Sequence, residues 1–166
     1  MTPLLLGHVV AALLALPIGG YQLFRPTKGD AQHVLLGRLW AGLMLWVALS
    51  SFWIRDLRPG ELSLLHVLSA VTLVTVTLGV VHARRGNIPA HKGTMRGSWL
   101  GLCGAFVGAV AVPDRVIPTF VVTNPQGALA ALTALATLTA LLIWLGARIT
   151  RQLDAADPAH HASTSA

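Results

Sequence analysis

The chain has 166 residues, of which 54% are hydrophobic and only 11% are charged, and its mean hydropathy is +0.68. About a quarter of the residues of a soluble globular protein are charged, so this composition excludes that class and predicts an integral membrane protein. The net charge of +6 does not indicate nucleic-acid binding, because the 12 Lys and Arg residues fall almost entirely between apolar runs, as membrane topology requires. We therefore expect the lipid bilayer as a partner, and no nucleic acid.

Five apolar stretches approach the length needed to span a bilayer, which takes roughly 20 residues of helix. They are residues 3–24, 33–54, 61–82, 94–112 and 128–147. We expect the first to be a retained membrane helix, because no positive region precedes it and no obvious cleavage site follows it. The predicted fold class is all-α: an integral membrane helical bundle of five transmembrane helices.

The predicted domain organisation is a single transmembrane domain over residues 1–147. Its four-helix core consists of the hairpins 3–54 and 61–112, and the fifth helix is 128–147. The connection 113–127 is long and apolar, so it is expected either to lie in the membrane interface or to re-enter the membrane. Residues 148–166 are predicted to be a disordered cytoplasmic tail, since no apolar periodicity continues beyond Arg151.

Basic residues are distributed unequally between the two sides of the predicted helices. Alternating the loops places nine Lys and Arg residues on one side and three on the other. Because cytoplasmic loops carry an excess of Lys and Arg, we expect the N-terminus outside and the C-terminus in the cytoplasm. The nine are Arg25, Lys28, Arg38, Arg84, Arg85, Lys92, Arg96, Arg148 and Arg151, and the three are Arg55, Arg58 and Arg115.

An internal repeat relates the two hairpins. His8 and His33 are 25 residues apart, and so are His66 and His91. Superposing the two windows at an offset of 58 residues also aligns Ala12 with Ala70 and Arg38 with Arg96. Two hairpins of the same orientation would be related by an axis along the membrane normal, which brings equivalent positions to equivalent depths.

The repeat predicts two facing pairs of histidines. In an up-and-down four-helix bundle the first and third helices are diagonal neighbours, as are the second and fourth. His8 is therefore expected to face His66 toward the outer side, and His33 to face His91 at the cytoplasmic side. Two imidazoles from opposite helices are suitable axial ligands for a b-type haem, because each presents a neutral nitrogen to the iron. We expect haem iron as the metal at these pairs.

Arg38 and Arg96 follow the inner histidines by about one and a half turns, just inside the apolar segments. A charge is costly there unless it faces a partner, water or a headgroup. Haem propionates are one such partner and an anionic phospholipid is the other, so both arginines are candidate cofactor-binding residues. His82 has no equivalent histidine in the repeat and either stays at the cytoplasmic boundary or replaces His91 as the inner ligand.

Two motifs resemble those of a known family. The stretches HVLLGR, beginning at His33, and HKGTM, beginning at His91, are similar to the H-R-x-x-G-R and H-R-x-W-M motifs of a family of small bacterial membrane proteins of unknown function. The resemblance implies a place in the bacterial inner membrane. The later stretch PDR, at residues 113–115, resembles a P-G-R-like turn of the same family. The resemblance selects His8, His33, Gly37, Arg38, His91, Met95 and Arg115. Val34, Thr94 and Asp114 depart from the family pattern, and none of these departures removes a histidine. The layout is also similar to that of the di-haem four-helix membrane cytochromes, which pass electrons across a bilayer.

Three functions compete on this sequence. The first is an electron-transfer protein with b-type haem, exchanging electrons with a redox partner or a quinone. The second is a non-enzymatic membrane subunit or assembly factor whose histidines are structural, since no hydrolase or transferase motif is present and an enzymatic activity stays undecided. The third, a small-solute transporter or channel, has less support, because no acidic residue lies in the middle of an apolar segment and five helices leave little room for a path.

Overall fold

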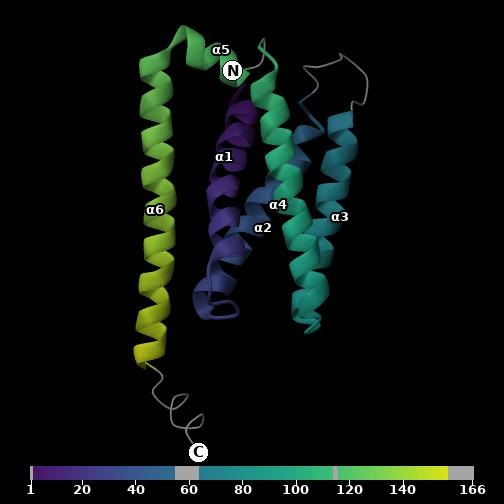
Figure 1. Ribbon diagram of the computed structural model, residues 1–166, viewed down its shortest axis with the longest axis vertical. Coiled ribbons are helices and arrows are strands. Elements are labelled where there is room, and N and C mark those ends of the chain that lie inside the picture. Colours follow the sequence, from purple (N-terminus) through teal and green to yellow (C-terminus); the bar gives the residue numbers. More distant parts are fainter. Residues whose placement is uncertain (1, 55–63, 114–115, 157–166) are drawn as a thin grey trace, which may run out of the picture.

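The computed structural model describes residues 2–54, 64–113 and 116–156, and the regular structure of these residues is entirely helical (Figure 1). Six helices follow one another along the chain: α1 (Pro3–Phe24), α2 (Ala31–Ser51), α3 (Leu64–Arg84), α4 (Ile88–Ala111), α5 (Val116–Thr123) and α6 (Pro125–Ala156). The predicted all-α class is confirmed.

Four of the helices are long and apolar enough, each on its own, to cross a membrane: α1, α2, α3 and α6. The helix α4 meets that test only in combination with α5, because its first turns carry polar and basic residues. The molecule is therefore an integral membrane bundle with four or five spanning helices. The short α5 crosses one end of the bundle between α4 and α6 (Figure 1). Whether it lies in the membrane interface or re-enters the membrane stays a prediction.

Helix boundaries differ from the sequence prediction mainly in α4 and α6. The helix α4 begins at Ile88 rather than at residue 94, because the Asn87 side chain accepts a hydrogen bond from the Ala90 N–H and caps the helix. The helix α6 continues to Ala156, so the predicted start of the disordered tail at residue 148 was wrong. Residues 157–166 of that tail lie outside the described residues.

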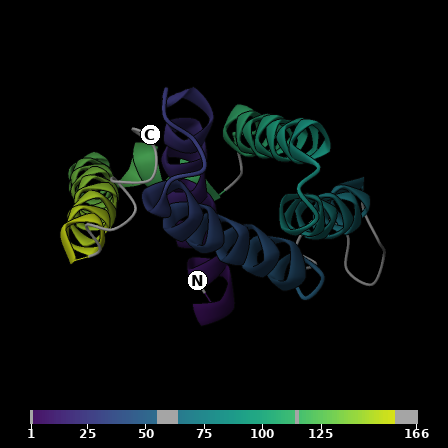
Figure 2. The same ribbon diagram turned by 90° about the horizontal axis from the view of Figure 1, so that it is seen from below.

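The first four helices form a closed ring of neighbours. Within the described residues α1 packs on α2, α2 on α3, α3 on α4 and α4 on α1, whereas no such packing joins α1 to α3 or α2 to α4. The diagonal relationship that the repeat predicts is therefore found. The view in Figure 2 places α6 on the side of α1 and α2 that is away from α3 and α4, where it contacts α1 and α2.

The centre of the bundle is filled by apolar side chains from all four helices of the ring. Its fully buried members include Ile18 from α1, Met44 from α2 and Val76 from α3. Two indoles complete the packing: Trp40 donates to the Ala15 carbonyl at 2.9 Å, and Trp99 donates to the Leu16 carbonyl at 3.0 Å. Each indole therefore buries its ring without leaving the N–H unpaired.

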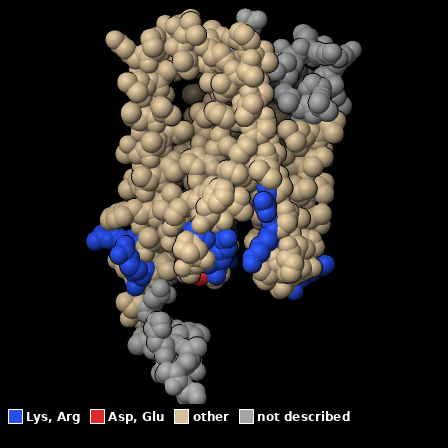
Figure 3. Space-filling model, viewed as in Figure 1, with Lys and Arg blue, Asp and Glu red and all other residues tan. Residues whose placement is uncertain are grey.

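All nine described Lys and Arg residues belong to one end of the bundle, which we call the basic end. They lie in or beside the α1–α2 and α3–α4 turns, in the first three turns of α2 and α4, and in the last turns of α6. Figure 3 shows Lys and Arg side chains gathered at this end of the visible face. Arg55, Arg58 and Arg115, which were predicted on the opposite side, lie outside the described residues. The helix α5 is at the opposite end (Figure 1).

Candidate functional site: a histidine pair at the basic end

The structure brings His33 and His91 together across the diagonal of the bundle. The two residues lie in the first turns of α2 and α4, helices that are not packed on each other in the described residues. Their ring centroids are 6.3 Å apart and their ring planes are nearly perpendicular, at 86°. The predicted inner pair is therefore a contact in the structure.

The separation of the rings excludes a direct hydrogen bond between them. An imidazole nitrogen lies about 1.1 Å from its ring centroid, so the nearest nitrogens are at least about 4 Å apart, against about 3 Å for a hydrogen bond. A metal ion bound at about 2 Å to each of two histidines holds their nitrogens at most about 4 Å apart. The spacing of His33 and His91 therefore excludes a direct hydrogen bond, and it admits a bridging atom where a nitrogen of each ring points toward the other ring.

A backbone carbonyl of the neighbouring helix orients His91. The Nδ1 atom of His91 is 2.9 Å from the Gly79 carbonyl oxygen in α3, and it donates this hydrogen bond when the ring is neutral. That tautomer leaves Nε2 with a free lone pair, which is the usual arrangement of a metal-binding histidine. Gly79 is buried, and a Cβ there would overlap the Met95 side chain and lie 2.8 Å from Thr94 Oγ1.

Two buried polar atoms without hydrogen-bond partners in the described structure accompany His33. Gln22 of α1 donates from Nε2 to the His33 carbonyl at 2.7 Å, and Gly37 leaves the space that this side chain uses. The Gln22 Oε1 atom and the His33 Nδ1 atom are both buried and unpaired there. Because leaving buried polar atoms unpaired is costly, a water molecule or ligand that bonds to these two atoms would stabilise the protein.

The indoles of Trp40 and Trp99 set the spacing of the two helices that carry the histidines. Trp40 is seven residues after His33 on α2, and Trp99 is eight residues after His91 on α4, so each indole lies two turns along nearly the same helix face. Both indoles donate to adjacent carbonyls of α1. This shared anchor fixes α2 and α4 relative to α1 just beyond the histidine pair.

The outer histidines do not form an equivalent pair in the described structure. His8 is 2.8 Å from the Ser50 Oγ atom, at the end of α2, while the His66 ring lies 5.9 Å from the Phe52 ring. The end of α2 therefore contacts both histidines. The predicted outer haem between His8 and His66 stays a prediction.

The remaining candidate residues have different surroundings. Arg38 and Arg96 are exposed at the basic end and form no ion pair within the described part of the chain. The ring that contacts His33 belongs to His91, and the alternative that His82 serves as the inner ligand stays a prediction. Met95, which the resemblance selects, packs against the core. Arg115, which the family motif selects, lies outside the described residues.

An ion pair closes the turn that leads to His33. Asp30 caps α2 by accepting from the His33 N–H at 2.9 Å, and Arg25 donates to both of its carboxylate oxygens at 2.9 and 2.6 Å. Burial acts to raise the pKa of Asp30, but the bonds from Arg25 and the His33 N–H outweigh it, and the pKa is lowered. The carboxylate is therefore charged at neutral pH and holds the start of α2 in place.

Comparison with known protein families gives one match. The profile of the family described as "Predicted membrane protein (DUF2306)" matches residues 5–146, which is most of the chain. The chain belongs to this family. The resemblance indicated by the motifs at His33 and His91 is thereby confirmed, whereas the similarity to di-haem cytochromes stays a prediction. Comparisons with curated proteins and with solved structures gave no match.

The DUF2306 family description names a membrane protein and no reaction, so the chemistry of this member rests on its side chains. Sequence reasoning found the histidines but missed Gln22 and Gly79, which contact them. Gln22 could have been noticed as a polar residue that continues the buried face of α1 four residues after Ile18. No sequence pattern indicates Gly79, because its contribution is a backbone carbonyl that meets His91 only after the helices have packed.

Proposed function

We propose that this DUF2306 protein binds one b-type haem between His33 and His91 and transfers electrons within the membrane. The single observation that carries the proposal is the meeting of these two rings across the bundle, at 6.3 Å between centroids. The sequence repeat predicts the same pair independently. Haem supplies one-electron chemistry, because its iron alternates between the ferric and ferrous states.

The charge around the pair favours haem over a simple metal cation. Arg25, Lys28 and Lys92 lie near the same end as the pair. The acidic side chain whose contacts are described there, that of Asp30, is already bound to Arg25. No group of three or more metal-binding His, Cys, Asp or Glu side chains occurs in the described part of the chain. A divalent cation with two ligands among positive charges would be weakly held, whereas the propionates of haem would be attracted.

Specific residues of the chain would serve this function. Gly79 keeps the Nε2 atom of His91 available, and Gln22 holds the backbone of His33. Gln22 Oε1 and His33 Nδ1 are the unpaired atoms that a bound water or the cofactor environment would satisfy. We propose Arg96 as the propionate partner, because Arg38 lines a groove on the other side of α2.

The test is a reduced-minus-oxidised spectrum of detergent-purified protein expressed with ample haem. We expect a Soret difference that His33→Gln and His91→Gln each abolish. His82→Gln is the matched control, because His82 lies at the same end and should leave the spectrum unchanged. A flat Soret region in the wild-type protein would overturn the proposal.

A second function has separate support. Four glycines of α4 meet no neighbouring atom where a Cβ would be, which leaves an open small-residue face: Gly93, Gly97, Gly104 and Gly108. Such faces allow close packing of another membrane helix, so the protein is alternatively a membrane subunit whose histidines are structural. In that case Gly97→Leu should reduce cross-linking to a partner in native membranes, and His33→Gln should leave cross-linking unchanged.

We also propose that the basic end faces the cytoplasm of a bacterial inner membrane. The grouping of the nine described cations at this end supports the assignment through the positive-inside rule. A reporter that is active only in the cytoplasm, fused after Ala156, should then be active. Activity of a reporter that requires the opposite compartment would contradict the orientation.

A further inference from the structure

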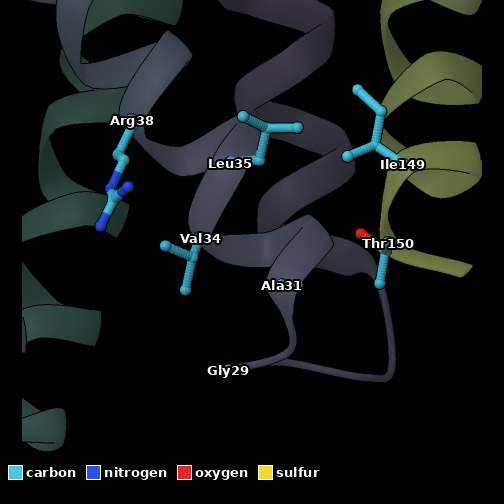
Figure 4. A pocket seen from close by; sticks show the side chains of 7 residues that line it. All are labelled: Gly29, Ala31, Val34, Leu35, Arg38, Ile149 and Thr150. Atoms are coloured by element: carbon cyan, nitrogen blue, oxygen red, sulfur yellow. The ribbon is translucent and has the colours of Figure 1, made fainter. Parts of the chain in front are cut away.

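A groove with a volume of about 350 Å³ runs between α2 and α6 at the basic end (Figure 4). Its walls are mostly apolar: Val34 and Leu35 come from α2, and Ile149 comes from α6. Thr150 also lines the groove, but its hydroxyl donates to the Gly146 carbonyl of its own helix. The groove therefore presents an apolar surface with few free hydrogen-bonding groups.

One charged side chain lines this groove, that of Arg38. Figure 4 shows its guanidinium directed toward the end where Gly29 lies and away from α6. Arg38 is the eighth residue of α2, about 10 Å into a helix that qualifies as a membrane span. A guanidinium at this depth reaches toward the headgroup layer and needs an anionic partner there.

The described protein residues do not provide that partner. The described carboxylate of the basic end, that of Asp30, is bound by Arg25. Other cations of this end are already engaged: Arg148 lies over the Trp144 ring at 4.9 Å, and Lys28 donates to the Leu23 carbonyl. Arg38 thus combines an exposed charge, a place inside a membrane span and an adjoining apolar groove.

We propose that this groove binds an anionic phospholipid. The lipid phosphate accepts hydrogen bonds from the Arg38 guanidinium, and an acyl chain lies along Val34, Leu35 and Ile149. A phospholipid fits both parts of the site, because it joins a phosphate to a long apolar chain at the depth of the membrane interface. The bound lipid would cover the junction of α6 with α2, which the described chain leaves open.

Native mass spectrometry of the full chain in detergent tests the site with phosphatidylglycerol as the probe. We expect one lipid per chain to be retained, and Arg38→Gln to weaken its binding at least about tenfold, as befits loss of a charge-assisted hydrogen bond. Arg84→Gln is the matched control, since it removes an exposed arginine of the basic end that does not line the groove. It should retain the lipid as the wild type does.

A second variant separates the site from general effects on folding. Ile149→Trp would fill the groove while leaving every charge in place, and it should also lower retention of phosphatidylglycerol. Binding of phosphatidylglycerol that is unchanged in both Arg38→Gln and Ile149→Trp would overturn the proposal. Full displacement of the lipid by inorganic phosphate would do so as well, because the site would then recognise a free anion. His33→Gln, which tests the proposed haem site, should not change the binding of phosphatidylglycerol, so the lipid proposal is tested separately from the haem proposal.

Discussion

Gly19 lies where two rigid indole rings leave no room for an added methyl group. A Cβ there would lie 2.5 Å from Trp99 Cδ1 and would overlap the Trp40 indole. These are the indoles that donate to the Ala15 and Leu16 carbonyls. Gly19→Ala must therefore displace at least one of two rings whose hydrogen bonds anchor α2 and α4 to α1.

The cost of Gly19→Ala can be worked from its parts. Overpacking a buried site costs about 1–3 kcal/mol, and a lost hydrogen bond costs about 0.5–1.5 kcal/mol more. The better helix propensity of alanine opposes this by up to about 1 kcal/mol. We expect a net loss of roughly 2 kcal/mol in the free energy of unfolding. The proposed binding of haem should weaken as well, because the displaced indoles lie two turns from the histidines on α2 and α4.

Denaturant unfolding in detergent, followed by tryptophan fluorescence, measures this loss. Gly42→Ala is the matched control, because it adds the same methyl group to α2 at a position with no atom within 4 Å. It should leave stability unchanged or slightly raised. If Gly19→Ala proved as stable as Gly42→Ala, the proposed anchoring of both indoles on α1 would be wrong.

Two further predictions concern the basic end. Gln32, which is buried, donates to the Ile143 carbonyl at 3.1 Å and so ties α2 to α6 at the basic end. Gln32→Leu should therefore increase protease cleavage in the last turns of α6 while α1 to α4 stay protected. Asp30→Asn keeps the cap of α2 but loses the ion pair with Arg25, which should lower stability by less than about 1 kcal/mol at neutral pH. Because the pKa of Asp30 is lowered in the folded state, this contribution is present above about pH 4 and is lost as the pH falls further, so the two proteins should converge in acid unfolding curves.

The sequence predicted the helices well because bilayer thickness fixes their length. Residues 3–24 match α1 at both ends. The prediction was less accurate for α4 because hydropathy alone ignores its polar first turn, which Asn87 caps. The extent of α6 was underestimated for a similar reason: its last turns are polar, yet Arg151 donates back to the Ala147 carbonyl and the helix continues.

The candidate site was predictable only as far as the repeat reaches. Equal spacing of histidines in two hairpins implies equal depth and a diagonal relation, and His33 and His91 are found accordingly. The repeat does not indicate which neighbouring side chains or carbonyls form hydrogen bonds with each imidazole. At the opposite end the Ser50 hydroxyl contacts His8, an interaction across 42 residues that no local pattern indicates.

The central claim is that His33 and His91 together bind one haem, and a haem titration of the purified apoprotein tests it most directly. We expect the Soret absorbance to reach its plateau at one haem per chain, with His91→Gln abolishing the response and His82→Gln preserving it. Binding that persists unchanged in both His33→Gln and His91→Gln, or no binding in the wild-type protein, would contradict the claim.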